Sequence, residues 1–290
     1  MPLEEIIRTE TNDIRDGAEF GCRHTLDTHW RIASFHMHPH YEFYLFLQGH
    51  TQILIEDERF DAHPGDLFVF PPGMLHRAVL LDYACPYERA YFYVTRKALS
   101  EISSADFSLL DLLDHTVRGG NYSYRMDDES ANQFLSLIDH FEDQPEPLDP
   151  IAPLMNRSRI QMLSLLVSRV MRQQEVLSPR QPERISEVIR YINDHIQEPL
   201  SLDSLAERFF ISKYTLLHDF KSYANISVHQ YILYKRVIYA QHLLRHGVSP
   251  GNAAKESGFN DYAGFYRAFV RQNNLTPQAY FQASHAASAL

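Results

Sequence analysis

Histidine is concentrated near the start of this chain, and one glutamate, Glu42, closely follows three of the histidines. Of the 16 histidines, eight fall within residues 24–76. Two blocks stand out, HMHPHYE at 36–42 and GDLFVFPPGMLH at 65–76. Three imidazoles and one carboxylate form a donor set that suits a first-row divalent metal. The candidate metal ligands are His36, His38, Glu42 and His76.

β-Strands must position these side chains. From about residue 20 to residue 94, short aromatic and branched runs alternate with Gly and Pro turns, which indicates an antiparallel sandwich or barrel. The predicted strands cover 36–47, 51–56, 59–63, 67–70, 77–81 and 91–94. Residues of equal parity share one face of a strand, so His36, His38 and Glu42 are expected to point into one interior. Pro39 interrupts that run.

The two blocks resemble the two motifs of the cupin barrel, at the spacings of its metal-binding members. The resemblance implies a divalent metal in the barrel. The same side chains also suit a metal-free pocket for a small effector, or a structural remnant, and the three interpretations stay open. Nearby aromatic residues would add stacking surfaces for a ligand. The candidate effector-binding residues are Trp30, His36, His38, His40, Glu42, Tyr44 and His76.

After the last predicted strand the pattern changes to a helical period. Helices are predicted over 95–103, 107–113 and 127–141. An acidic, Pro-rich break at 142–150 precedes a long helix over 151–171. That helix carries a wide apolar stripe, which either packs on the barrel or forms a dimer seam. Residues 177–183 form the expected linker between two domains.

The last third of the chain contains an internal repeat with a constant offset of 49 residues. The matched pairs include Phe220 and Phe269, Ser227 and Thr276, and Tyr231 and Tyr280. A fixed spacing of chemically matched residues indicates two similar helical units. Each unit has a short helix, a turn and a second helix, which is the helix-turn-helix arrangement. The second helices are predicted at 213–223 and 262–271, and a long helix over 228–246 joins the units.

This repeat resembles the AraC/XylS family of bacterial transcription regulators over about residues 184–281. The motifs that carry the resemblance are SLDSLA at 201–206, SKYxLxxxFK at 212–221, GFxDxxxFxRxF at 258–269 and LTPxxY at 275–280. The family implies that each monomer presents two recognition helices to successive major-groove faces of double-stranded DNA, roughly 34 Å apart. It also implies RNA polymerase as a partner.

The resemblance assigns DNA contacts by position in the two predicted reading helices. The assigned residues are Lys213, Tyr214, Thr215, Leu217, His218, Lys221, Asp261, Tyr262, Ala263, Tyr266, Arg267 and Arg271. His218 and Arg267 occupy equivalent positions of the repeat. Arginine can bond guanine through two hydrogen bonds, whereas histidine offers one weaker contact and leucine only an apolar surface for a thymine methyl group. We therefore expect the second unit to supply more base specificity than the first.

Charge and composition agree with this division of the chain. Although the net charge is −10, residues 180–290 hold 12 Lys and Arg against 9 Asp and Glu, so the excess acid lies in the N-terminal part. A slightly basic domain suits DNA binding, although the signal is weak. The two cysteines, the acidic N-terminus and the absence of a long apolar run predict a cytoplasmic protein with free thiols.

The sequence thus predicts an α+β multidomain protein. Residues 1–176 are expected to form a cupin-like antiparallel β-barrel with flanking helices, which senses a ligand and dimerises. Residues 184–290 are expected to form an all-α domain with two helix-turn-helix units. The predicted function is sequence-specific transcription regulation in response to a small effector, such as a sugar or related metabolite by family analogy.

Two other functions fit parts of the sequence. One is a metal-dependent cupin enzyme, such as a dioxygenase or isomerase, and the other is a direct metal or redox sensor. The double reading unit argues against the enzyme, which would have no use for it. A homodimer is expected because a second DNA-binding head raises avidity.

Overall fold

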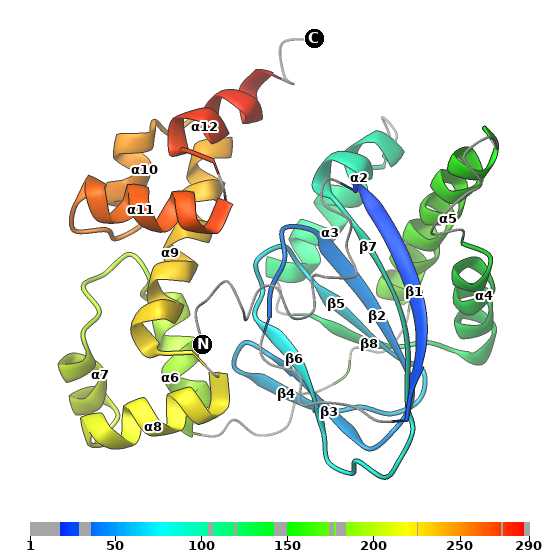
Figure 1. Cartoon of the computed structure of the whole chain (residues 1–290), viewed down its shortest axis with the longest axis horizontal. Helices are drawn as coiled ribbons and strands as arrows, with labels where there is room; N and C mark the ends of the chain where they lie inside the picture. Colours follow the sequence, from blue (N-terminus) through cyan, green and yellow to red (C-terminus); the bar gives the residue numbers. More distant parts are fainter. Residues whose placement is uncertain are drawn as a thin grey trace. The chain divides into compact units, whose positions relative to one another are not determined.

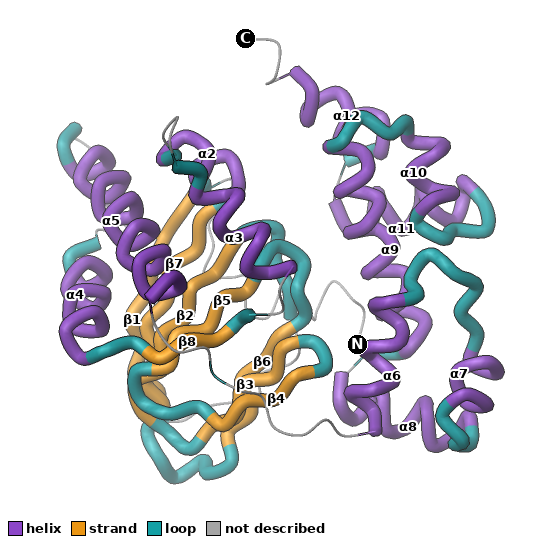
Figure 2. The backbone as a smooth tube through the Cα atoms, turned by 180° about the vertical axis from the view of Figure 1, so that it is seen from behind, coloured by secondary structure: helices purple, strands orange, loops and turns teal. Residues whose placement is uncertain are grey.

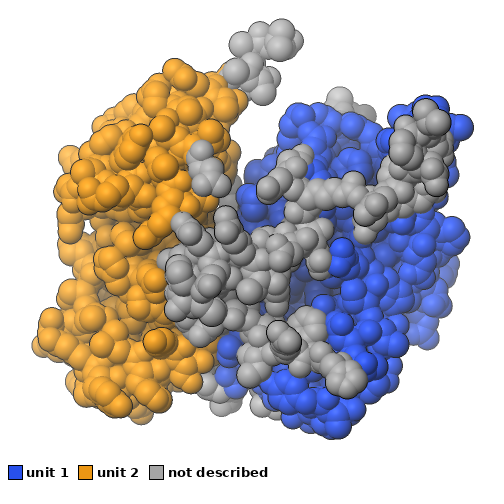
Figure 3. Space-filling view, in the orientation of Figure 1, with its two compact units in different colours: residues 1–181 blue, residues 182–290 orange. Residues whose placement is uncertain are grey.

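The computed structural model describes residues 18–28, 36–103, 107–118, 121–141, 150–173, 177, 184–224, 226–273 and 275–286. The chain divides into two compact units, Met1–Gln181 and Pro182–Leu290, which are coloured differently in Figure 3. Each unit has a hydrophobic core of its own.

Within the described residues, the first unit forms two antiparallel sheets (Figure 1). The five-stranded sheet has the order β1-β7-β2-β5-β8, and the three-stranded sheet has the order β4-β3-β6. The strands are β1 (Phe20–Asp27), β2 (Tyr41–Gln48), β3 (Thr51–Ile55), β4 (Glu58–Asp61), β5 (Asp66–Phe70), β6 (His76–Leu80), β7 (Tyr87–Val94) and β8 (Ser123–Arg125). The predicted class, an antiparallel sheet domain followed by a helical domain, is confirmed.

The sheet differs from the expectation in two respects. Strands β1 and β8 have no counterpart among the predicted strands, and β8, with three residues, is too short for alternation to reveal it. The described strands pair within two separate sheets and do not close into a single barrel. The closed cupin-like barrel is therefore corrected to two sheets that share a core.

Strand β2 shows how alternation separates two apolar layers. Tyr44 and Phe46 share a buried cluster with Ile53 of the three-stranded sheet. Phe43 belongs to a different buried cluster, which includes residues of the helices. Because Glu42 has the parity of Tyr44, its side chain belongs to the layer between the two sheets.

Helices cover the other face of the five-stranded sheet (Figure 2). They are α2 (Arg96–Ile102), α3 (Leu109–Arg118), α4 (Asp128–Asp139) and α5 (Ala152–Gln173). Side chains cap the starts of α2 and α4. Thr95 accepts a hydrogen bond from the backbone N–H of Ala98, and Asp127 accepts one from that of Ser130.

His24 ties helix α4 to the sheet. Its Nδ1 lies 2.8 Å from Asp139 Oδ1, and its Nε2 lies 2.9 Å from Glu88 Oε1. Burial alone would lower the pKa of His24, but the hydrogen bonds and charges of Asp139 and Glu88 outweigh burial and raise it. Both ring nitrogens face acceptors, so the charged imidazolium is the form that this contact stabilises.

The second unit consists of helices in the order expected for two helix-turn-helix units. They are α6 (Arg184–Asp194), α7 (Leu202–Arg208), α8 (Lys213–Ala224), α9 (Val228–Arg245), α10 (Pro250–Glu256), α11 (Tyr262–Asn273) and α12 (Pro277–Ala286). The helices predicted at 213–223, 228–246 and 262–271 are present as α8, α9 and α11. Gly247, with φ of +86°, follows the C-cap of α9, where a left-handed glycine commonly ends a helix. No helix among the described residues is both long and apolar enough to cross a membrane.

Candidate functional site

The histidine segment at 36–40 precedes strand β2 and is not part of it. Strand β2 begins at Tyr41, because Pro39 lacks the backbone N–H that a sheet ladder requires. His36 instead forms an isolated antiparallel bridge with His76, with N···O distances of 3.0 and 3.1 Å. The strand predicted over 36–47 is therefore wrong at its start. This bridge between His36 and His76, and not a shared strand face, brings the two histidine-containing segments together.

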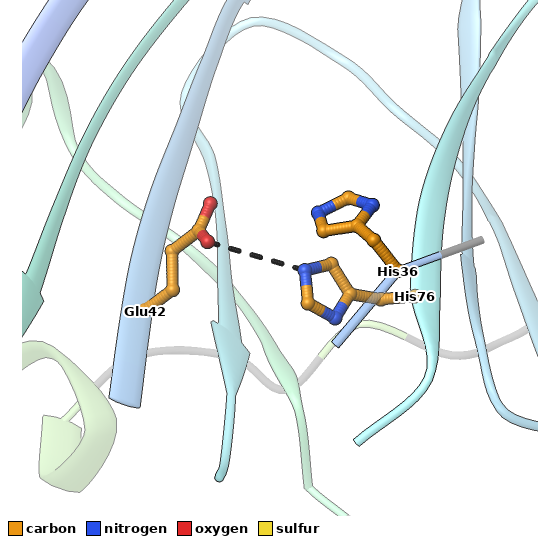
Figure 4. A group of neighbouring side chains, drawn as sticks. All are labelled: His36, Glu42 and His76. Atoms are coloured by element: carbon orange, nitrogen blue, oxygen red, sulfur yellow. Dashed lines mark ion pairs between the residues drawn. The ribbon is translucent and has the colours of Figure 1, made fainter. Parts of the chain in front are cut away.

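Glu42 lies where the two histidine blocks meet. Figure 4 shows it opposite the rings of His36 and His76, and its Oε2 lies 3.9 Å from His76 Nε2. His36, Glu42 and His76 offer ligand atoms within 4.8 Å of one another. His38, His40 and Glu42 form a second such group. The histidine cluster, defined as these five residues, thus contains all four predicted metal ligands.

His38 has two unlike neighbours for its ring nitrogens. Its Nδ1 lies 3.0 Å from the carbonyl oxygen of His40, which can only accept, so Nδ1 carries a proton and donates. Its Nε2 lies 2.8 Å from Glu42 Oε2. In a neutral ring this Nε2 presents a lone pair to a carboxylate. A lone pair this close to a carboxylate oxygen is favourable only if a proton or a metal cation lies between Nε2 and Oε2.

His40 and His76 each carry a buried imidazole nitrogen without a hydrogen-bond partner among the described residues. This nitrogen is Nε2 in both residues. Burial, aided by the charges of His38 and His36, lowers the pKa of His40 to about 2. Burial, with the charges of His36 and His38, also lowers the pKa of His76 well below its ordinary value. Both rings are therefore neutral at neutral pH.

The hydrogen bond at the other nitrogen of His76 fixes which lone pair is free. Its Nδ1 donates to the carbonyl oxygen of Met74 at 2.9 Å, so Nε2 is the unprotonated atom. Metal-binding histidines are commonly oriented in this way by a backbone carbonyl. The ring of Phe70 stacks on His76 at 3.9 Å between centroids and shields one face of the site.

Two predicted effector residues, Tyr44 and Trp30, are not members of the histidine cluster. Tyr44 is buried in the layer between the sheets, and its hydroxyl pairs with that of Tyr87. Trp30 lies outside the described residues. The histidine cluster is thus a set of lone-pair donors in partly apolar surroundings. It can accept a divalent cation or hydrogen-bond donors such as hydroxyl groups.

The predicted reading residues of the first unit lie on the outer side of α8. Leu216 and Phe220 are buried, whereas Tyr214 is 78% exposed and Leu217 is 41% exposed. Lys221 is exposed near the end of the helix.

Three further predicted contacts on α8 already have protein partners. Lys213 forms an ion pair with Asp203 of α7. The hydroxyl of Thr215 lies 2.8 Å from that of the capping residue Ser212. His218 Nδ1 lies 3.0 Å from Asp219 Oδ1. Among the described residues, the other predicted contacts of α8, Tyr214, Leu217 and Lys221, are exposed and form no ion pair.

The second reading helix presents a more complete set. Phe265 and Phe269 are buried, while Tyr262 and Tyr266 are 46% and 41% exposed. Ala263, Arg267 and Arg271 are exposed as well. Asp261 accepts a hydrogen bond from the backbone N–H of Gly264 at 2.7 Å, so it caps α11.

The sequence reasoning missed one conspicuous residue, Phe210, in the first turn. Its side chain is 95% exposed and its φ is +53°, a left-handed conformation that is costly for a bulky residue. In the second turn the left-handed position is held by Gly258, with φ of +84°. The signal was present as two successive phenylalanines in a turn where the other unit has Ser257 and Gly258.

Comparison with known proteins finds one matching family in each of the two compact units. A family described as "AraC-like ligand binding domain" matches residues 21–164, and a family described as "Helix-turn-helix domain" matches residues 205–283. YbfI of Bacillus subtilis, an uncharacterized HTH-type transcriptional regulator, is 26% identical over 235 residues, which are 78% of each chain. LumQ of Photobacterium leiognathi, a probable transcriptional regulator, is 25% identical over 271 residues, 88% of this chain and 94% of LumQ.

A solved structure is similar to part of the chain. The DNA-binding domain of the transcriptional factor AdpA, in complex with a target DNA, is 28% identical, with a TM-score of 0.35. The match covers 37% of this chain and 97% of that domain.

A ligand-binding sheet domain followed by two helix-turn-helix units defines a DNA-binding transcription regulator that carries its own sensor domain. The chain belongs to the AraC family of transcription regulators, as the resemblance predicted. That family consists of regulators and not of enzymes, so the cupin-enzyme alternative is set aside.

Proposed function

We propose that this regulator reads promoter DNA with α8 and α11, each entering one of two successive major-groove faces. The observation that carries the proposal is the matched orientation of these two helices. Each buries Phe at equivalent repeat positions, Phe220 and Phe269, and leaves its opposite side exposed. The proposed contacts are Tyr214, Leu217 and Lys221 from α8 and Tyr262, Ala263, Tyr266, Arg267 and Arg271 from α11. Lys213, Thr215, His218 and Asp261 support this surface through the partners described above.

A gel-shift titration across salt concentrations tests this function. Full-length protein is expected to enrich a specific duplex from a random-sequence pool and to bind it more tightly than scrambled DNA. Its affinity should fall linearly with salt on logarithmic axes, with a slope of about −0.9 for each phosphate that the protein neutralises. Binding without sequence preference, or without salt dependence, would contradict the proposal.

We further propose that the histidine cluster binds the effector, a hydroxylated small molecule such as a sugar, together with a first-row divalent metal. The support is the free lone pair of His76 Nε2, the buried His40 Nε2 that has no hydrogen bond among the described residues, and the close contact of His38 with Glu42. A bound divalent cation would act as a Lewis acid toward the oxygen atoms of the effector. Effector binding must favour one arrangement of the two units over another, since otherwise it could not regulate DNA binding.

The exposed face of α5 supports a homodimer. One side of this helix is buried on the sheet domain through residues such as Ile160, Leu163 and Val167. The opposite side, with Ile151 just before the helix, exposes a second row of apolar side chains that are 46–66% exposed: Ile151, Leu154, Met155, Met162 and Leu165. Their spacing of three, four and seven residues matches a helix–helix seam. One face of α5 thus packs on the sheet domain. We propose that the opposite, exposed face packs against a second copy of this chain.

Leu165→Glu tests the dimer. Burying a charge in an apolar seam is costly, so the dimer dissociation constant is expected to rise at least about tenfold, as measured by sedimentation equilibrium. Gln133→Glu, which adds the same charge at an exposed polar position of α4 outside the proposed seam, should leave the dimer intact. An unchanged dissociation constant for Leu165→Glu would exclude this face as the interface. A dimer on promoter DNA in the cytoplasm, in contact with RNA polymerase, completes the proposed function.

A further inference from the structure

Arg236 is a buried cation in the middle of the helix that joins the two reading units. It lies on α9 and is 8% exposed. Among the described residues no carboxylate forms an ion pair with it. Burial therefore lowers its pKa below the ordinary arginine value. A buried, unpaired guanidinium is expensive and is retained only where its hydrogen bonds compensate for the lost water.

Those hydrogen bonds go to the first helix-turn-helix unit. Arg236 Nε donates to the carbonyl oxygen of Ile196 at 3.0 Å, and Nη2 donates to that of Glu198 at 2.7 Å. Both acceptors lie in the segment that follows α6 and leads into α7. Carbonyl groups past the end of a helix lack partners within it, and a cation there also interacts favourably with the helix dipole.

Gly258, in the second helix-turn-helix unit, lies against the same segment and shares the carbonyl group of Ile196 with Arg236. A Cβ atom at this position would lie 2.8 Å from the oxygen of Ile196, 2.9 Å from that of Gln197 and 3.0 Å from Arg236 Nε. Its φ of +84° also favours glycine. Gly258 is the first residue after α10 and its C-cap, at the start of the turn that leads to α11. The turn before α11 therefore rests directly on the segment between α6 and α7, in the first helix-turn-helix unit.

We infer that Arg236 and Gly258 together fix the spacing and angle between the two reading helices, and hence the separation of the two DNA elements that one chain recognises. Arg236 is a positioning residue, because its side chain is buried and, among the described residues, its hydrogen bonds go to backbone carbonyl groups. Besides this contact, α9 packs against α8 through the rings of Tyr231 and Phe220 and against α11 through a core that includes Phe265. Arg236 and Gly258 add the link that runs directly from one unit to the other. The inference rests on the proposed reading of DNA by both helices.

Spacing tolerance on DNA tests the inference. The full-length protein first selects its site from a random-sequence duplex pool, and Tyr214→Ala and Arg267→Ala identify which element each unit reads. One, two or three base pairs are then inserted between the two elements, and affinities are measured by fluorescence anisotropy. The wild-type chain is expected to lose about tenfold or more with one inserted pair, which both separates and rotates the elements. Arg236→Met should reduce that penalty to threefold or less, and Arg236→Lys, which retains a donor, should lie between them.

Two further variants keep the experiment decisive. Arg245→Met is the matched control, because Arg245 also lies on α9 but bonds Tyr280 within the second unit, so its spacing penalty should equal that of the wild type. Gly258→Ala presses a methyl group on the same carbonyl oxygens, and it should shift the preferred spacing even if Arg236→Met does not fold. An unchanged penalty in the folded Arg236 and Gly258 variants overturns the inference while DNA reading stands. A wild-type chain that selects no sequence overturns both.

Discussion

Replacing Glu42 with glutamine is expected to strip divalent metal from the histidine cluster, with the metal dissociation constant raised at least about a hundredfold. Removing a group that merely orients a ligand already costs about ten- to a hundredfold in metal affinity, and removing a charged ligand should cost no less. Glu42 is the member that both candidate ligand groups share. Glutamine retains its size but removes the only anionic donor. The wild-type chain, purified without a histidine tag and loaded with Zn²⁺ or Co²⁺, should hold about one equivalent by elemental analysis.

Glu88→Gln is the matched control for this substitution. Glu88 also pairs with a histidine of the same unit, His24, at 2.9 Å, close to the 2.8 Å between Glu42 and His38. His24 differs because both of its ring nitrogens already have carboxylate partners. Glu88→Gln should therefore keep the metal content of the wild type. Equal metal in the Glu42→Gln and wild-type proteins would reject the site, and a wild-type chain that takes up no metal would leave the cluster as a polar pocket.

Metal removal should also change stability, since a ligand that binds only the folded state stabilises it. At a free metal concentration of about a hundred times the dissociation constant, that stabilisation is about 2.7 kcal/mol. A chelator is thus expected to lower the unfolding midpoint of the first unit in the wild-type chain and to have little effect on Glu42→Gln. The comparison isolates the bound ion from any structural effect of the substitution itself.

Local signals in the sequence were sufficient for most of the helices. The caps Thr95, Asp127 and Ser201 act on backbone groups within one turn, and the apolar period of α8 and α11 is set by the residues inside each helix. The 49-residue repeat then allowed the helices of the second helix-turn-helix unit to be predicted from those of the first. The same reasoning found every member of the histidine cluster, because strand ends and turn residues bracket it in the sequence.

Long-range contacts account for what the sequence did not reveal. The bridge between His36 and His76 joins residues 40 positions apart. The parity argument selected the right residues, but it assumed a strand from residue 36, whereas β2 begins at Tyr41. The role of Arg236 depends on carbonyl groups 38 and 40 residues away, and backbone acceptors leave no mark on the amino-acid types. Nor could the sequence show that Lys213 and His218 would be engaged by nearby acids, which changes the balance between the two readers.

Arg267→Ala is expected to weaken binding to the selected DNA site about ten- to a hundredfold, corresponding to the roughly 1–3 kcal/mol of a bidentate contact to guanine. Arg267 is exposed on α11 and forms no ion pair within the described residues, so its guanidinium is available to a base edge. At the equivalent position of α8, His218 Nδ1 lies 3.0 Å from Asp219 Oδ1. A carboxylate beside a reading residue is repelled by DNA phosphates. His218→Ala should therefore change the affinity no more than about threefold.

Arg271→Ala separates base reading from attraction to phosphates. Arg271 lies four residues beyond Arg267, in the last turn of α11. If it contacts a phosphate, its loss should weaken specific and scrambled DNA alike and reduce the salt slope by about one unit, whereas Arg267→Ala should relax sequence preference at one position of the site. Fluorescence anisotropy on both duplexes at several salt concentrations measures the two effects, with thermal unfolding as the check on folding. Equal losses for His218→Ala and Arg267→Ala would show that the two units read DNA symmetrically, and the engagement of His218 by Asp219 would then be broken on the DNA.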